Sequence, residues 1–282
     1  MPQAAVVIVG AGRMGQGLGL ALHRAGWQVS LIARTRHRVV APLALHTGAR
    51  AAATLAASVV LLAVPDDGIA GLASELAAER GIGADQVVLH LSGLLDRVAL
   101  RALESTGAGL GSFHPLQSVA DPAAAPERLR GAYVGVEGDE RALRAAEGLA
   151  SAMGMTAIPL SSGGKAAYHA GAVMAANYTV ALAGVAERLA IEGGVTREIA
   201  ERLYLPLIRG AVDNLGLGPV AALTGPVRRG DIRTIEAHLS ALSRNDRELY
   251  RLLGLAALRL ARDGGLDPAT ADLVEAALSR RD

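Results

Sequence analysis

Short, continuous apolar runs separate longer segments of helical periodicity throughout the first 160 residues of the chain. The clearest runs are AAVVIV at 4–9, VVLLAV at 59–64 and VVLHL at 87–91. Runs of this length, rich in β-branched residues and followed by glycine, proline or serine, are typical of parallel strands buried on both faces. Further strands are expected at 29–33, 110–113, 133–136 and 155–160. The pattern predicts an α/β domain with a doubly wound parallel sheet over residues 1–162.

The remaining residues, 163–282, show helical periods only. The first helix should begin at Lys165, and positions 166–186 contain no Asp, Glu, Lys or Arg. A charge-free run of this length is compatible with a membrane span. Its Ala- and Gly-rich composition, with His169 and Asn177 inside it, instead favours the buried spine of an all-helical domain and no membrane contact. Later helices are expected at 197–215, 233–261 and 268–278.

A glycine motif follows the first predicted strand. Gly10-Ala11-Gly12-Arg13-Met14-Gly15 lies between that strand and a helix expected at 16–25. Glycines at this spacing permit a tight turn, a close approach of the backbone to a pyrophosphate, and close packing of helix on strand. The helix N-terminus adds N–H donors and a positive dipole end. The sequence therefore predicts a dinucleotide-binding turn.

The end of the second predicted strand indicates which dinucleotide is bound. NAD-binding folds usually place an acid there for the ribose hydroxyls, whereas this chain has Arg34, Thr35 and Arg38. Guanidinium groups can pair with a 2′-phosphate, so these three residues favour NADP. The alternative is a solvated basic turn in an Arg-rich chain.

The turn after the third predicted strand should border the cofactor as well, because ligands of open parallel sheets lie beyond the carboxyl ends of the strands. Val64 and Pro65 occupy that turn. Asp66 or Asp67 is expected to cap the helix that follows.

Lys165 is the chain's only lysine, because 28 Lys plus Arg minus one Lys leaves 27 arginines. A desolvated lysine can lose its proton near neutral pH, whereas arginine stays protonated, so Lys165 is a candidate for proton transfer. In a helix it shares a face with His169, four residues later. Ser92 and His114 follow two other predicted strands and should reach the same rim as the glycine turn.

Two further residues are candidates at the edge of this site. Asn177 lies in the same predicted helix as Lys165 and should contact the substrate through other residues or lie in the core. Asp231 follows Gly225-Pro226 and Arg229-Gly230. It either caps the next helix or belongs to an anion-binding loop that closes over the site.

Composition narrows the classes of partner. The formal charge of +1 and the scarcity of aromatic residues argue against a nucleic-acid binder. The chain has no cysteine and no metal-ligand spacing, so neither a disulfide framework nor a metal site is expected. Without a signal-peptide pattern the expected location is cytoplasmic. An apolar helical domain favours a homodimer formed through residues 163–282.

The motifs together resemble the superfamily of NAD(P)-dependent reductases that join a Rossmann domain to a helical domain like that of 6-phosphogluconate dehydrogenase. Lys165 at the start of the interdomain helix is similar to the lysine that hydroxyacid dehydrogenases and ketopantoate reductases use on the substrate oxygen. Those enzymes have an asparagine four residues later, where this chain has His169. The resemblance implies a substrate bound between the two domains.

The whole chain more narrowly resembles a bacterial family with a Rossmann-like domain and a C-terminal domain of unknown function, whose members are described as oxidoreductases. The segments that carry this likeness are Ala63-Val64-Pro65-Asp66, His90-Leu91-Ser92-Gly93, His114-Pro115-Leu116, Lys165 through His169 to Asn177-Tyr178, and Gly225-Pro226 with Arg229-Gly230-Asp231. Ser92 and His114 also resemble the Ser and His with which prephenate dehydrogenases hold the reacting hydroxyl.

These observations predict an NADP-dependent oxidoreductase that transfers hydride between the nicotinamide and a small carbonyl, hydroxyl or imine substrate. Lys165 would supply a proton to the substrate oxygen, and His169, Ser92 and His114 would orient the substrate. Two alternatives stay open: a prephenate dehydrogenase-like enzyme, and a sensor or scaffold that binds NADP without consuming it.

Overall fold

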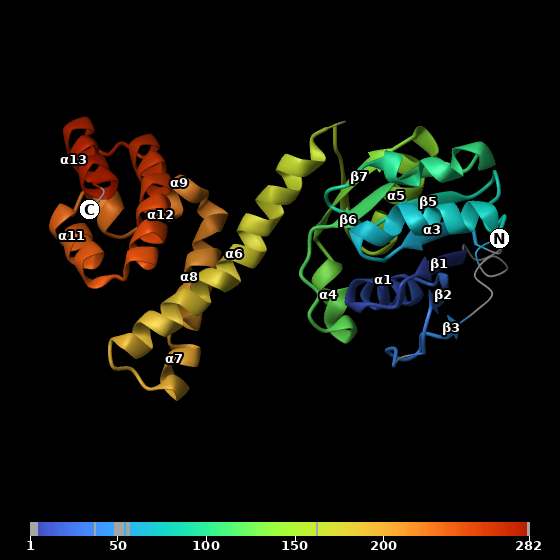
Figure 1. The fold of residues 1–282 in the computed structure, drawn as a ribbon, viewed down its shortest axis with the longest axis horizontal. Coiled ribbons are helices and arrows are strands. Elements are labelled where there is room, and N and C mark those ends of the chain that lie inside the picture. Colours follow the sequence, from blue (N-terminus) through green and yellow to red (C-terminus); the bar gives the residue numbers. More distant parts are fainter. Residues whose placement is uncertain (1–4, 37, 48–53, 55–56, 162, 281–282) are drawn as a thin grey trace. The chain divides into compact units, whose positions relative to one another are not determined.

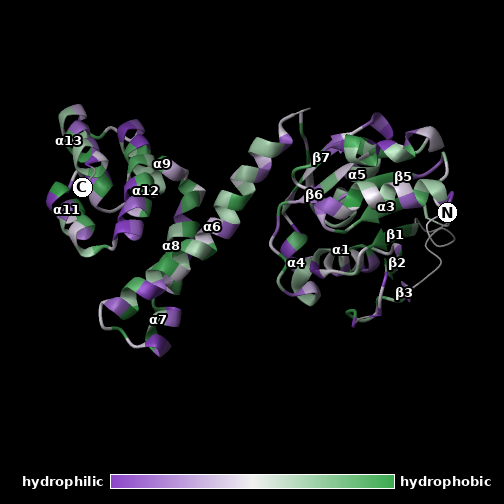
Figure 2. Ribbon diagram, in the orientation of Figure 1, coloured by the Kyte–Doolittle hydropathy of each residue, from purple (hydrophilic) through white to green (hydrophobic). Residues whose placement is uncertain are grey.

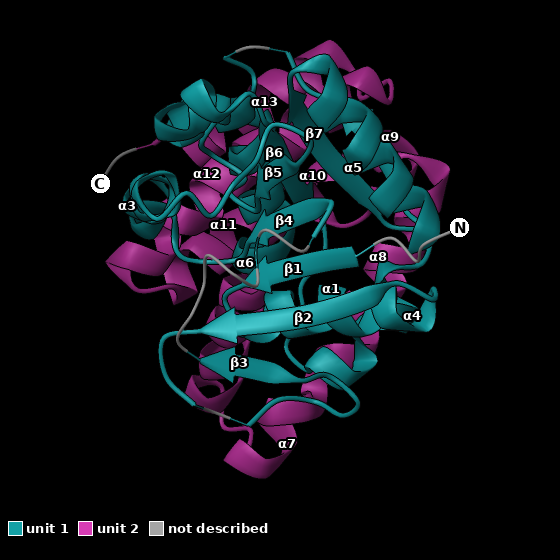
Figure 3. Ribbon diagram, turned by 90° about the vertical axis from the view of Figure 1, so that its right-hand side faces the viewer, with its two compact units in different colours: residues 1–179 teal, residues 180–282 magenta. Residues whose placement is uncertain are grey.

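The computed structural model describes residues 5–36, 38–47, 54, 57–161 and 163–280. The chain divides into two compact units, Met1–Thr179 and Val180–Asp282 (Figures 1 and 3). The division falls inside helix α6, which spans Lys165–Glu192, whereas the sequence predicted a domain boundary at residue 162. The first turns of α6 belong with the sheet because the side chains of Lys165 and Tyr168 bond to its strands.

An eight-stranded sheet forms the centre of the first unit, with the order β3-β2-β1-β4-β5-β6-β7-β8 in the described part of the chain. Neighbouring strands are parallel except β6 and β7, which are antiparallel. This mostly parallel sheet confirms the predicted fold class, and β3 is a short edge strand that the apolar pattern did not predict. The strands are Ala5–Val9 (β1), Gln28–Ala33 (β2), Leu45–Thr47 (β3), Val59–Leu62 (β4), Val87–His90 (β5), Gly109–Pro115 (β6), Tyr133–Gly138 (β7) and Thr156–Pro159 (β8).

Helices cover both faces of the sheet. Successive side chains of a strand point to opposite faces, so Val6 and Ile8 of β1 pack with α1, α4 and α5. Val7 and Val9 pack with α3 and the 3₁₀ helix η1 on the other face. These helices are α1 (Arg13–Arg24), α3 (Asp66–Ala78), η1 (Arg97–Thr106), η2 (Pro122–Ala124), α4 (Ala125–Leu129) and α5 (Glu140–Ala152).

The second unit is helical throughout its described residues, as predicted. Two of its predicted helices are each broken in two. The period at 197–215 is interrupted at Tyr204, because Pro206 fits the first turn of a new helix but not the interior of a continuous one. The period at 233–261 is interrupted before Ser243, whose hydroxyl caps the next helix by accepting from the Asp246 amide at 3.3 Å.

A small core formed by Ile235, Leu258 and Val274 holds the C-terminal helices of this unit together. The elements are α7 (Arg197–Leu203), α8 (Leu205–Asn214), η3 (Leu215–Leu217), α9 (Pro219–Ala222), α10 (Pro226–Arg229), α11 (Ile232–Ala241), α12 (Arg244–Asp263) and α13 (Pro268–Ser279).

Helix α6 differs from its prediction in burial. The sequence predicted a buried spine, but only Lys165 and Ala190 of its residues are buried, and Met174 and Val180 are largely exposed. Figure 2 shows apolar residues along its length. The prediction of a buried helix was wrong for a single chain. An uncharged helix is buried only where neighbouring helices cover every side of it, and the absence of charged residues does not ensure that such helices are there. No helix in the described residues is long and apolar enough to cross a membrane.

Candidate functional site

The glycine turn joins the end of β1 to the start of α1. Gly10 has φ 117°, a conformation that favours glycine, and its amide donates to the Ile32 carbonyl at 2.8 Å. A Cβ on Gly15 would lie 2.1 Å from the Gly10 carbonyl oxygen, so the helix can approach the strand only without a side chain there. Gly12 is the N-cap of α1 and has no side chain over the first amides of the helix. The turn therefore presents the N-terminus of α1 to solvent, as anion binding requires.

Buried Gln16 ties this turn to the segment after β2. Its Nε2 donates to the Ala11 carbonyl at 2.8 Å, and its Oε1 accepts from the Val40 amide at 2.9 Å. The sequence analysis did not single out Gln16. The sequence could have indicated Gln16, because it is a polar amide residue within an apolar helical pattern, in the first turn after the glycine motif.

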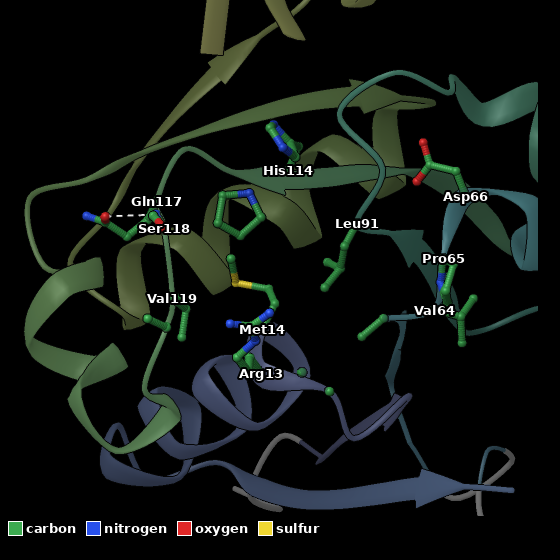
Figure 4. Close-up of a pocket in the computed structure, with 15 residues that line it drawn as sticks. Arg13, Met14, Val64, Pro65, Asp66, Leu91, His114, Gln117, Ser118 and Val119 are labelled. Atoms are coloured by element: carbon green, nitrogen blue, oxygen red, sulfur yellow. Dashed lines mark hydrogen bonds between the residues drawn. The ribbon is translucent and has the colours of Figure 1, made fainter. Parts of the chain in front are cut away.

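A cavity of about 570 Å³ lies against the glycine turn, at the carboxyl ends of the central strands. Figure 4 shows Arg13 and Met14 on one side of it, and Val64, Pro65, Asp66, Leu91 and His114 on the other. The segment Gln117–Ala120 closes a further side. The described lining residues are Gly12, Arg13, Met14, Gly15, Ala63, Val64, Pro65, Asp66, Leu91, His114, Pro115, Gln117, Ser118, Val119 and Ala120.

The cofactor residues expected from the sequence divide into two groups. Gly12, Arg13, Met14, Gly15, Val64 and Pro65 line the cavity, while Gly10 and Ala11 form the turn behind it. Arg34, Thr35 and Arg38 are exposed in the segment after β2 and are not among the described lining residues. The sequence analysis missed the lining segment from Gln117 to Ala120, although it directly follows His114 at a strand end.

Asp66 and Ser92 are joined at the rim of the cavity. The Ser92 hydroxyl donates to Asp66 Oδ2 at 2.7 Å and accepts from the amides of Leu94 and Leu95. Asp66 was expected to cap helix α3, but the N-cap residue is Pro65 and no side chain caps that helix. The carboxylate of Asp66 instead binds Ser92, which brings the ends of β4 and β5 together.

His114 lies between the cavity and helix α6. Its Nδ1 is 3.1 Å from the Tyr168 hydroxyl, and its ring stands edge-on to that of His169 at a centroid separation of 5.3 Å. Burial, followed by the charges of His169 and Lys165, lowers the pKa of His114 to about 4. His114 is therefore a neutral imidazole at pH 7.

Gly93 allows this arrangement. A Cβ at Gly93 would lie 2.3 Å from His169 Nδ1 and 2.8 Å from His114 Nε2. His169 Nδ1 is buried without a hydrogen-bond partner among the described residues. The structure thus brings together Ser92, His114 and His169, three of the four residues expected at the catalytic rim.

The fourth, Lys165, lies behind that rim. Its side chain is only 3% exposed, and it is not among the described residues that line the cavity. The ammonium nitrogen donates to the Ser92 carbonyl at 2.9 Å and to the Ser112 hydroxyl at 2.7 Å. Burial lowers the pKa of Lys165 to about 8, against the opposing charges of Glu137, Asp96 and Asp66. Lys165 therefore binds the turn after β5 and the middle of β6 to the first turn of α6.

Three polar residues of this network, His90, Ser112 and Tyr168, were not predicted from the sequence to have a role in the site. His90 is fully buried, donates from Nε2 to the Asp96 carbonyl at 3.0 Å, and accepts from the Ser92 amide at Nδ1. Ser112 lies beside it on β6, and Tyr168 is on α6. The signal available in the sequence was the alternation of faces along a strand. His90 lies two positions before Ser92, and Ser112 lies two positions before His114, so each shares a face with a residue that was predicted for the site.

Asn177 lies further along α6, and Asp231 belongs to the second unit. Asn177 is exposed on α6. Asp231 caps α11 by accepting from the Thr234 amide at 3.2 Å and its hydroxyl at 2.7 Å, which confirms the capping interpretation. The Thr234 bonds, more than the nearby arginines, lower the pKa of Asp231. A role for either residue toward the substrate stays a prediction.

The buried histidines make stability depend on pH. His90 and His114 each have a pKa of about 4 in the folded chain, mainly because of burial, against an ordinary value of 6.5. A lowered folded pKa means that the unfolded chain binds more protons between pH 6.5 and 4, so stability present above 6.5 is lost as the pH falls. At pH 5 the expected loss is about 1–2 kcal/mol per histidine.

Urea unfolding at pH 7 and pH 5, with ring-proton NMR to follow the individual histidines, checks this expectation. Two of the seven histidines should titrate below pH 5. An unchanged urea midpoint, with all the rings titrating near pH 6.5, would contradict the burial of these imidazoles.

Two domain families match the chain. Residues 1–115 match the Rossmann-like domain, and residues 132–257 match a domain of unknown function, DUF2520. No curated protein matches.

Solved structures share the fold over almost the whole chain. A candidate NADP oxidoreductase from Bacteroides fragilis is 21% identical with a TM-score of 0.71, covering 92% of this chain and 98% of its own. A protein from Thermotoga maritima is 26% identical with a TM-score of 0.66, over the same shares of 92% and 98%. Pyrroline carboxylate reductase from Plasmodium falciparum, solved with NADP bound, is 12% identical with a TM-score of 0.59, over 99% and 100%.

Proposed function

Since the chain belongs to the family that joins a Rossmann-like domain to the DUF2520 domain, we propose that it is an NADP-dependent oxidoreductase. Hydride would pass between the nicotinamide and a small carbonyl, hydroxyl or imine substrate. The observation that carries this proposal is one cavity that connects the glycine turn with the rim of His114 and Asp66. A phosphate-binding turn and polar groups at neighbouring strand ends are what a hydride-transfer site of this fold requires.

The glycine turn fits the cofactor's pyrophosphate. The free amides at the N-terminus of α1 would bind it, because Gly12 has open space where a side chain would otherwise lie. Arg34, Thr35 and Arg38 would reach the 2′-phosphate of the adenosine ribose. The Plasmodium structure, which holds NADP in the same overall fold, supports this assignment. The cofactor, when bound, supplies the hydride.

The protein's own residues would orient the substrate. His114 lines the cavity and offers Nε2, while the Tyr168 hydroxyl at Nδ1 holds its ring in place. Lys165 acts in this proposal as a positioning residue, because its nitrogen binds Ser92 and Ser112 and its side chain is buried away from the lining. This replaces the direct proton transfer that the sequence suggested for Lys165.

The test separates the proposed reductase from the two alternatives. NADPH absorbance is followed with 2-keto acids, aldehydes and imines, and prephenate is tested with NADP for reduction of the cofactor. The proposal expects consumption of NADPH with at least one class of the panel. Tight NADPH binding without turnover of any substrate would establish a sensor or scaffold, and turnover of prephenate alone would establish the dehydrogenase alternative.

A homodimer through the helical unit is the second part of the proposal. Val180, Leu207 and Leu217 are each more than two-thirds exposed in that unit. Large apolar side chains exposed on a helical unit are candidates for burial at an interface, and a second copy offers the same surface in return.

The Leu207→Glu substitution should therefore raise the dimer dissociation constant by at least about 30-fold, the effect of losing an interface anchor worth some 2 kcal/mol. Light scattering after size exclusion gives the mass of the particle. Val98→Glu is the matched control, since Val98 is also exposed but lies on η1 of the first unit. A natural chain that runs as a monomer at every concentration would refute the interface.

A further inference from the structure

The lining of the cavity carries an uneven distribution of charge. Among its described residues the charged side chains are Arg13, at the start of α1, and Asp66, at the rim. Figure 4 shows Arg13 beside Met14 on the glycine-turn side and Asp66 across the cavity. Arg13 lies at the start of α1, where the cofactor's phosphates would bind, so Asp66 is the charge that the described lining carries on the rim side. The buried Lys165 ammonium behind the rim interacts with Glu137 and Asp96 as well as with Asp66, and these two carboxylates offset its charge. An anionic substrate group would be repelled there, and a cationic one attracted.

Apart from the weakly acidic Ser118 hydroxyl, the described lining has no proton donor suited to carbonyl reduction. Hydride transfer to a ketone or aldehyde leaves a negative oxygen that must receive a proton. Arg13 keeps its proton at all physiological pH values. His114, with its pKa lowered to about 4 by burial, is neutral at pH 7. Lys165 has both of its hydrogen bonds on Ser92 and Ser112, and its side chain is buried away from the described lining.

We propose that the substrate is an iminium ion, a carbon–nitrogen double bond that carries a positive charge, bound with its nitrogen toward Asp66. The proposal rests on the proposed function, since it names the substrate class of the same cavity. Asp66 Oδ2 accepts from Ser92, which fixes the carboxylate at the rim and leaves Oδ1 for the substrate.

The reaction balances without a protein acid. Bound NADPH would supply the hydride that forms the new C–H bond at the iminium carbon, and the C–N π pair would become the lone pair of the nitrogen. The products are a neutral amine and oxidised cofactor. The amine takes a proton from water after release. Asp66 stabilises the cationic form of the substrate and so favours the electrophile that accepts hydride most readily.

A permanently charged probe tests the class of substrate. N-methyl-1-pyrrolinium has no N–H proton to lose, so its charge is independent of pH. With NADPH it should be reduced with a kcat/KM at least about 100-fold above that of pyruvate or acetaldehyde, the ratio that a contact between ions can supply. Its kcat/KM should stay level from pH 6 to 8.

Failure of the iminium assignment and failure of the proposed oxidoreductase function give different results. Reduction of pyruvate or acetaldehyde without reduction of the pyrrolinium would overturn the iminium assignment and leave the oxidoreductase standing. The proposed function itself would be overturned if the chain binds NADPH tightly but turns over none of these compounds and no member of the wider panel of carbonyls and imines.

Variants of the rim provide the second readout. Asp66→Asn keeps an acceptor for Ser92 but removes the charge, and should lower kcat/KM for the pyrrolinium by about 10- to 100-fold while NADPH affinity is retained. Asp67→Asn is the matched control, because it removes the same charge from the same helical turn outside the described lining. Equal activity of the Asp66 and Asp67 variants would refute the contact between Asp66 and the substrate.

Discussion

Gly12→Ala is expected to leave the stability of the chain unchanged and to weaken NADPH binding by about 100-fold or more. No atom lies within 4 Å of a Cβ built on Gly12, and its backbone conformation suits alanine. The methyl group would nevertheless enter the cavity where the pyrophosphate must approach the helix amides. Losing two hydrogen bonds to a charged phosphate, at about 1.5 kcal/mol each, corresponds to this factor. Fluorescence titration with NADPH and urea unfolding give the two quantities.

Two other glycines make the comparison specific. Gly15→Ala should lower both the stability of the chain and its NADPH affinity, because the added Cβ would lie 2.1 Å from the Gly10 carbonyl oxygen and 3.1 Å from the Ala63 methyl group. Forcing apart packed backbone costs about 1–3 kcal/mol or more. Gly71→Ala on α3 has open space and lies outside the described lining, so it should leave NADPH affinity unchanged and raise stability by about 0.5–1 kcal/mol, as alanine does inside a helix. Full NADPH affinity in Gly12→Ala would contradict binding at this turn.

Lys165→Met is expected to lower kcat by about 100-fold and to change NADPH affinity less than about threefold. Methionine fills a similar volume but donates no hydrogen bond, so the buried Ser92 carbonyl and Ser112 hydroxyl lose their donor. Each unsatisfied buried group costs about 1–3 kcal/mol, which displaces the turn after β5 and the middle of β6. A misplacement of about 1 Å at the rim can cost this factor in turnover.

The pH profile separates positioning from proton transfer at Lys165. The neutral amine still has two N–H bonds for its two acceptors, so its deprotonation near pH 8 leaves the rim in place. We therefore expect no decline in kcat of the natural chain between pH 7 and 9. A decline centred near pH 8 that Lys165→Met abolishes would make Lys165 the acid after all. The Lys165→Arg variant should also keep NADPH binding and lose turnover, since guanidinium does not fit the buried site.

Local patterns were sufficient to predict the sheet and its glycine turn. Continuous β-branched runs ended by Gly10, Pro65 and Ser92 identified three central strands, because buried parallel strands need apolar residues on both faces. The position of His114 at a strand end followed from the same logic. The edge strand β3 escaped detection because its three residues are partly exposed and carry no such pattern.

Long-range packing could not be predicted from the same patterns. Whether Lys165 faces the cavity or the strands depends on how α6 meets β5 and β6, which the helical period does not specify. The segment 121–130 is rich in proline and alanine and has no strand pattern, so nothing local indicated that Ala125 and Leu129 would be buried against α1. The exposure of α6 likewise depends on which helices surround it. The breaks in the predicted helices at 197–215 and 233–261 could have been predicted from Pro206 and Ser243, since proline and serine both occur often at the start of a helix.

The most direct test of the central claim follows the hydride itself. The chain is incubated with NADPH that carries deuterium at both C4 positions and with each member of the carbonyl and imine panel, and mass spectrometry measures the label in the products. We expect a single deuterium on the reduced carbon of at least one substrate, and its loss in Gly12→Ala at the same NADPH concentration. Cofactor that binds at the glycine turn but retains its deuterium with every substrate would contradict the account.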